Sequence, residues 1–181
     1  ENFRKANSPK ILHIATHGFY LKNIESDDKL FLGFENSAIK ENSLLRSGII
    51  LAGAGPSTSD SLNKDSENDG IVTAYEASLL NLSNTDLVVL SACQTGLGDD
   101  MGSEGVAGLQ RSFTIAGAKN IIMSLWPVDD YATQFLMTEF YKNYAASQNS
   151  ETSFKLAQLE VKKKYPQPYY WAAFVLLKTF N

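Results

Sequence analysis

The chain has 181 residues, of which 44% are apolar and 20% charged, with a formal net charge of −4 at pH 7. This composition is that of one globular domain with a substantial core, and it leaves little room for a second domain. The lysines are scattered except at Lys162, Lys163 and Lys164, which we interpret as a solvated helix end. The sequence therefore lacks the basic patch that direct nucleic-acid binding requires.

Targeting signals are also absent from the sequence pattern. No apolar stretch approaches the roughly 18 to 20 residues of a membrane-spanning helix, and residues 1–10 are polar, unlike the apolar centre of a signal peptide. The single cysteine excludes an internal disulfide. We therefore expect a cytoplasmic protein without a membrane segment. Because the chain begins with Glu1 instead of Met, we also expect it to be a portion of a longer protein.

The first half of the chain predicts two short strands and one helix. Ile11 to Thr16 is a short apolar run that ends at His17-Gly18, which is typical of a buried strand. A connection with minor structure is expected over residues 19–43, followed by a second strand over 47–52.

A loop and a helix start come next. Residues 53–70, rich in Ser, Asn, Asp and Gly, predict a mobile loop. Thr73 and Glu76 have the spacing of a capping box, in which side chain and backbone satisfy each other's N–H groups. This spacing predicts a helix from Thr73 to about Asn81.

The second half of the chain alternates apolar runs with amphipathic ones. Leu87 to Ala92 is apolar on both faces, as a central parallel strand covered by helices must be, and Cys93 follows it. This alternation predicts a parallel α/β sheet covered by helices. The remaining predicted elements are a helix over 104–116 ended by Gly117, a strand over 120–125, helices over 129–146 and 152–164, and a strand over 172–177.

The ends of the predicted strands indicate where chemistry takes place. In open α/β sheets, ligands bind outside the carboxyl ends of the strands, and His17 and Cys93 each follow a predicted strand. If these strands are parallel neighbours, about 4.8 Å apart, the imidazole and the thiol lie at the same edge although 76 residues separate them. A cysteine needs a base to act as a nucleophile at neutral pH. We therefore predict a dyad, with the N–H groups of Gly18 and Cys93 stabilising an oxyanion.

Five segments support a family resemblance. They resemble the CHAT domain, a caspase-like cysteine peptidase family related to caspases and separase and often fused to tetratricopeptide repeats. The segments are Ala15-Thr16-His17-Gly18, the run from Val88 to Gly98 around Cys93, the run from Glu104 to Arg111, the run from Met123 to Asp130, and Pro168 to Phe174.

The resemblance implies a fold and an activity. The fold is a caspase-like three-layer α/β/α arrangement with a mostly parallel sheet, whose N-terminal strand or strands would be absent from this chain. Residues 1–181 would form one CHAT-like domain in the C-terminal portion of a longer protein. The activity is that of a cysteine endopeptidase cleaving a protein substrate through His17 and Cys93, without a cofactor or metal. An upstream repeat or sensor domain, or a regulatory partner, would activate it.

Other readings remain open for several residues. Asp129 and Asp130 either line a pocket for a basic P1 side chain or cap the following helix, and Trp126 is either a pocket wall or core. His13 and His17 are about 13 Å apart if both lie on one strand, too far to share a zinc ion. The alternative to a peptidase is a catalytically silent caspase-like scaffold. A redox role for Cys93 is disfavoured because no second cysteine could resolve its oxidised form.

Overall fold

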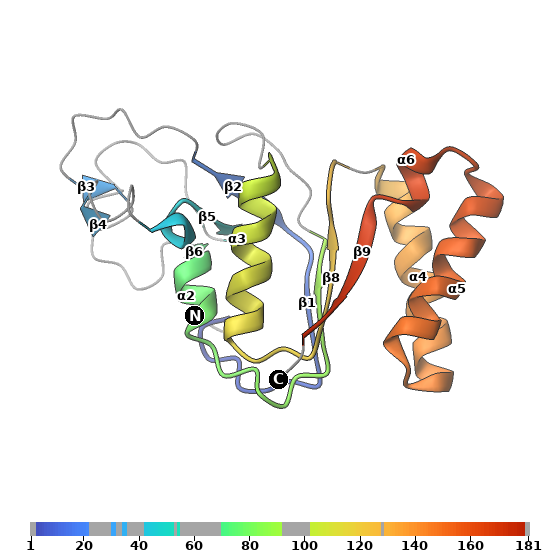
Figure 1. The fold of residues 1–181 in the computed structure, drawn as a ribbon, viewed down its shortest axis with the longest axis horizontal. Coiled ribbons are helices and arrows are strands. Elements are labelled where there is room, and N and C mark those ends of the chain that lie inside the picture. Colours follow the sequence, from blue (N-terminus) through green and yellow to red (C-terminus); the bar gives the residue numbers. More distant parts are fainter. Residues whose placement is uncertain are drawn as a thin grey trace.

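The computed structural model describes residues 3–21, 30–31, 34–35, 42–52, 54, 70–91, 102–127 and 129–179. Within these ranges the chain folds around a four-stranded sheet (Figure 1). Its strands, in the order β1-β7-β8-β9, are β1 (Ile11–Ile14), β7 (Leu87–Leu90), β8 (Asn120–Ser124) and β9 (Phe174–Lys178). The first three are parallel and β9 is antiparallel to β8. The prediction of a mostly parallel sheet is confirmed.

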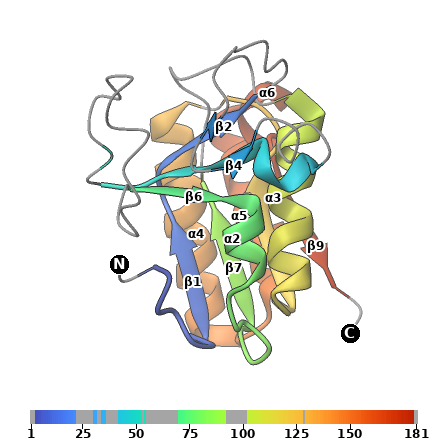
Figure 2. The ribbon, with the colours of Figure 1, turned by 90° about the vertical axis from the view of Figure 1, so that its left-hand side faces the viewer.

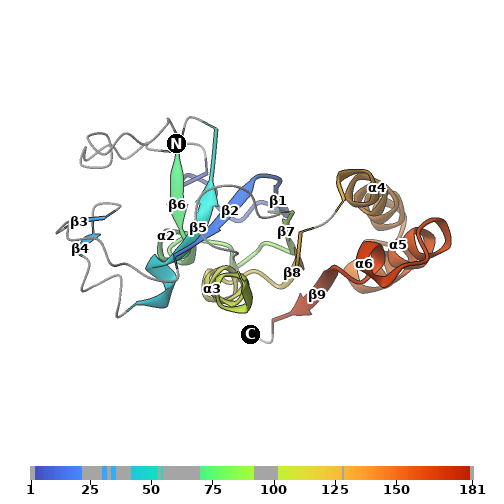
Figure 3. The same cartoon turned by 90° about the horizontal axis from the view of Figure 1, so that it is seen from above.

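Helices cover both faces of this sheet, which gives three layers (Figure 3). α4 (Asp130–Ser147), α5 (Ser150–Lys164) and the short α6 (Pro168–Trp171) lie on one face, and α2 (Ala74–Ser78) and α3 (Gly102–Ile115) lie on the other.

Alternate residues of the central strands face the two helical layers. Val88 and Leu90 pack with Phe113 of α3, while Leu87 and Val89 pack with Phe140 of α4. β7 is therefore buried on both faces, as its continuous apolar sequence predicts.

Local signals set the helix boundaries. Thr73 and Glu76 form the predicted capping box, although α2 ends at Ser78, earlier than expected. Asp129 caps α4 by accepting a hydrogen bond from the N–H of Ala132. The chain leaves the C-terminal end of α3 through Gly117, whose φ of 98° is accessible to glycine without strain. The other predicted boundaries agree with the structure to within two residues.

A second sheet corrects the prediction for the first strand. The strand expected over residues 11–16 ends at Ile14, and a separate strand, β2 (His17–Tyr20), begins at the histidine. β2 pairs antiparallel with β5 (Ser47–Ile50), which pairs with β6 (Ile71–Thr73). This small sheet lies across the carboxyl end of β1 and β7 (Figure 2).

Minor structure fills part of the predicted connection between residues 19 and 43. It comprises β3 (Leu30–Phe31), β4 (Phe34–Glu35) and the 3-10 turn Ser43–Leu45. Apart from residues 54 and 70, the predicted loop over 53–70 lies outside the described residues. No helix in the described ranges is long and apolar enough to cross a membrane.

Candidate active site

His17 lies where the two sheets meet. It is the first residue of β2, its side chain is exposed, and it follows the last residue of β1 by three positions. The link between the strands is held by the Thr16 hydroxyl, which donates a hydrogen bond to the carbonyl of Ile50 in β5. Because His17 itself pairs with Ile50, this bond fixes the backbone immediately before the imidazole.

The register of the large sheet relates His17 to Cys93. Ile14 of β1 pairs with Leu90 of β7, and the parallel ladder continues one residue further, where the N–H of Ser91 donates to the Ile14 carbonyl at 3.0 Å. His17 is three residues beyond Ile14, and Cys93 is three residues beyond Leu90. Cys93 lies outside the described residues, so its side-chain geometry with His17 stays a prediction.

Gly18 is buried in β2, opposite Ile49 of β5. Its proposed role as an oxyanion donor stays a prediction, since the Cys93 side of that site is not described. The small sheet is packed closely by α3. A Cβ added at Gly105 would lie 2.9 Å from Cβ of Tyr20, and one at Gly108 would lie 2.4 Å from Oγ of Ser47. These two glycines let the helix contact β2 and β5 directly, which fixes the strand that begins with His17.

The segment after β8 contains the residues predicted to bind substrate. Trp126 is partly buried against the core between the sheet and α4, and its indole N–H donates to the carbonyl of Tyr169 at 3.1 Å. Asp129 is the helix cap described above. Asp130 is exposed in the first turn of α4. Of the two carboxylates, Asp130 is therefore the one without a capping bond in α4.

A polar cluster around His13 was not predicted. The Tyr141 hydroxyl of α4 lies 2.9 Å from Nδ1 of His13, and Nε2 of His13 lies 3.4 Å from Oγ of Ser91. Burial lowers the pKa of His13 below its ordinary value. Burial, and secondarily the neighbouring Tyr144, raises the pKa of Tyr141 to about 12. The sequence held no local signal for this cluster, because its members come from three distant segments.

No described group of three His, Cys, Asp or Glu residues could hold a metal ion. His13 lies in β1 of the large sheet and His17 in β2 of the small sheet. The separation of about 13 Å expected for two residues on one strand therefore does not apply to them.

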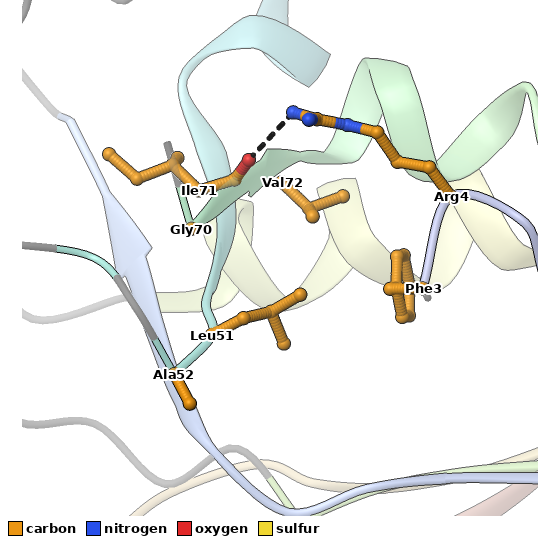
Figure 4. A pocket seen from close by; sticks show the side chains of 7 residues that line it. All are labelled: Phe3, Arg4, Leu51, Ala52, Gly70, Ile71 and Val72. Atoms are coloured by element: carbon orange, nitrogen blue, oxygen red, sulfur yellow. Dashed lines mark hydrogen bonds between the residues drawn. The ribbon is translucent and has the colours of Figure 1, made fainter. Parts of the chain in front are cut away.

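A small cavity of about 270 Å³ lies beside β5 and β6 (Figure 4). Leu51, Val72 and Phe3 supply apolar walls, and the guanidinium of Arg4 donates to the Ile71 carbonyl at 3.1 Å. The cavity contains no described nucleophile or general base, so we do not assign it to catalysis.

Comparison with known families identifies the chain. The sequence model of the CHAT domain matches residues 1–179, which is nearly the whole chain. The chain belongs to the CHAT domain family. The three-layer fold with its mostly parallel sheet agrees with the caspase-like architecture of that family.

Curated relatives of this CHAT domain are tetratricopeptide repeat proteins. Tetratricopeptide repeat protein 28 of Mus musculus is 32% identical over 109 residues, which cover 59% of this chain and 4% of that protein. Tetratricopeptide repeat protein 28 of Homo sapiens is 31% identical over 93 residues, covering 50% of this chain and 4% of that protein. The matches thus span a small fraction of these relatives' length.

Proposed function

We propose that this CHAT domain is a cysteine endopeptidase in which Cys93 is the nucleophile and His17 the general base. One observation is the main support for pairing His17 with Cys93. His17 and Cys93 follow, at the same distance of three residues, two paired positions on adjacent parallel strands, Ile14 and Leu90. Ile14 and Leu90 end their strands at the carboxyl edge of the large sheet, where ligands bind in α/β folds, and the chain continues from them to His17 and Cys93.

The chemistry follows from the two side chains. His17 accepts the proton of the Cys93 thiol, and the thiolate attacks the carbonyl carbon of the substrate peptide bond. The N–H groups of Gly18 and Cys93 stabilise the oxyanion. The C–N bond then breaks, the imidazolium of His17 protonates the leaving amine, and a thioester forms. Water, deprotonated by His17, hydrolyses the thioester and returns the thiol.

The family context supports regulation of this activity. The matched relatives are named for tetratricopeptide repeats, so we propose that a repeat or sensor domain in the longer protein, or a regulatory partner, activates the peptidase. The substrate is a protein, with Trp126, Asp129 and Asp130 near its side chains. The single cysteine supports the cytoplasm as its compartment.

The reactivity of the Cys93 thiol tests this proposal. Alkylation by iodoacetamide is followed by mass spectrometry of the peptide that contains Cys93, so that it reports on this residue within the longer protein. In the full-length activated protein we expect a midpoint of the pH–rate profile well below the ordinary thiol value of about 8.5. His17→Ala should return the midpoint to that value. An ordinary midpoint in the unmodified protein would favour the silent scaffold and reject the peptidase.

A further inference from the structure

The polar cluster of Tyr141, His13 and Ser91 connects three elements at one edge of the large sheet. His13 is the third residue of β1, Tyr141 comes from α4, and Ser91 directly follows β7. On β1, Leu12 and Ile14 face the α2–α3 layer, while Ile11 packs with the α4–α5 layer. By alternation, His13 shares the side of Ile11. It lies on the edge strand of the sheet and is exposed, so the direction of its ring is set by its hydrogen bonds to Tyr141 and Ser91.

The donor and acceptor of each hydrogen bond in the cluster can be assigned from the one at the Ile14 carbonyl. Oγ of Ser91 lies 3.5 Å from the carbonyl of Ile14, which can only accept, so the Ser91 hydroxyl donates there. Oγ of Ser91 then accepts from Nε2–H of His13 at 3.4 Å. That tautomer leaves Nδ1 as an acceptor, which the Tyr141 hydroxyl satisfies at 2.9 Å.

The cluster is thus a chain of neutral donors and acceptors. It runs from the Tyr141 hydroxyl through the His13 ring and the Ser91 hydroxyl to the backbone of β1. The ring of His13 also lies against that of Tyr141, with centroids 5.6 Å apart and planes tilted by 30°. A protonated His13 would place an N–H at Nδ1, opposite the phenolic hydrogen of Tyr141. The shifts of both groups, described above, favour the neutral form.

Ser91 connects this series of hydrogen bonds to the segment that contains Cys93. It forms three hydrogen bonds with β1: its N–H and its hydroxyl donate to the Ile14 carbonyl at 3.0 and 3.5 Å, and its hydroxyl accepts from Nε2 of His13 at 3.4 Å. Cys93 is two residues further along. The same strand, β1, leads to His17 three residues after Ile14. Without the bond to His13, only the two bonds to the Ile14 carbonyl would hold Ser91 against β1 at the point where the chain leaves β7 for Cys93.

We propose that His13 is a positioning residue for Cys93, acting through the hydroxyl of Ser91 and oriented by Tyr141. It holds the start of the nucleophile segment against the strand that presents the general base. This inference rests on the proposed peptidase function. The rate of a catalysed reaction falls steeply when a catalytic group is displaced by about 1 Å. A side chain that fixes the distance between nucleophile and base therefore affects reactivity without contacting substrate.

The test uses the alkylation of Cys93 in the full-length activated protein. His13→Leu and Ser91→Ala should each slow alkylation at pH 7 about tenfold and move the midpoint of the pH–rate profile towards that of a free thiol. Tyr141→Phe, which removes only the orienting hydroxyl, should have a smaller effect in the same direction. His13→Gln retains an N–H near the position of Nε2 and should restore most of the rate.

Two controls separate positioning from a loss of structure. Tyr75→Phe makes the same change on α2, outside the cluster and on a residue 39% exposed, and should leave the profile unchanged. Thermal unfolding of every variant shows whether it is folded. If His13→Leu fails to fold, Ser91→Ala and Tyr141→Phe decide the question.

The outcomes distinguish the two proposals. A lowered midpoint in the unmodified protein that is unchanged in Ser91→Ala and Tyr141→Phe overturns the positioning role and leaves the peptidase standing. An equal loss of rate in His13→Gln and His13→Leu also contradicts it, since the retained donor would then have no effect. An ordinary midpoint in the unmodified protein rejects both proposals.

Discussion

Arg4 and Glu76 join the N-terminal segment to the start of α2, with 2.8 Å between Nη2 of the arginine and Oε1 of the glutamate. The other carboxylate oxygen, Oε2, accepts from the N–H of Thr73 at 2.8 Å and closes the capping box. One carboxylate therefore serves both a helix start and an ion pair that spans 72 residues of sequence.

Substitutions at Glu76 should separate these two roles. Glu76→Gln keeps an acceptor for the cap but removes the charge, and because both side chains are about 30% exposed it should cost less than about 1 kcal/mol. Glu76→Ala removes both interactions and should cost about 1 to 2 kcal/mol. Urea unfolding measures the loss of stability in both Glu76 variants. Arg4→Met, which removes the ion pair and leaves the cap in place, is the control. Equal losses for Gln and Ala would show that the hydrogen bond from the Thr73 N–H to the residue 76 side chain contributes nothing to stability.

The cap of α4 gives a second prediction. Asp129→Asn retains the side-chain oxygen that accepts from Ala132, so the free energy of unfolding should change by less than about 0.5 kcal/mol. Asp129→Ala should lower it by about 1 kcal/mol. Chemical denaturation of the two variants side by side provides the measurement. Similar losses in both would mean that the charge of Asp129, and not its cap, stabilises the helix.

Substrate preference should depend on Asp130 more than on Asp129. Asp130 is exposed in the first turn of α4, whereas Asp129 is engaged in the cap. In a peptide library varied at P1, Asp130→Asn should lower kcat/KM for Arg and Lys about tenfold, a change of about 1.4 kcal/mol, and leave apolar P1 residues unaffected. Asp129→Asn is the matched control. The absence of any preference for Arg or Lys in the unmodified protein would remove both carboxylates as charge partners.

Stability should fall in acid because of His13. Its pKa in the folded protein lies below the ordinary value of 6.5 through burial, so the unfolded chain takes up a proton at a higher pH than the folded chain does. The stability that neutral His13 provides is thus present above pH 6.5 and is lost as the pH falls below it.

The free energy of unfolding, measured from pH 8 to pH 5, checks this sign. The unmodified protein should lose more stability over this range than His13→Gln, which has no titrating group at the position. His17 is the only other histidine, and it is retained in both proteins. A steeper acid loss in the variant would contradict the direction of the shift.

The central layer of the fold could be predicted from the sequence because its signals are local. Burial on both faces makes β7 a continuous apolar run, and the capping groups of α2 and α4 are adjacent in sequence to the helices they start. The reversed direction of β9 could not be predicted, since an apolar strand has the same pattern whether it runs parallel or antiparallel to its neighbour.

The small sheet was missed for a related reason. Only Ala15 and Thr16 separate the end of β1 from the start of β2, and neither is a Gly, Pro or Asn that would mark a break. The predicted dyad rests on strand order, which the pairing of β1 with β7 supports. The contact of His13 with Tyr141 joins residues 128 positions apart, and only the packing of α4 against the sheet brings them together.

The division into two sheets links the position of His17 to the hydrophobic core. His17 belongs to β2 in the small sheet, whereas the chain reaches Cys93 from β7 in the large one. The two sheets share one hydrophobic core, in which Tyr20, Ile49 and Val72 of the small sheet cluster with Ile14, Val88 and Leu90 of the large one. Because that core is closely packed, a substitution that repacks it should shift β2, and His17 with it, relative to the large sheet.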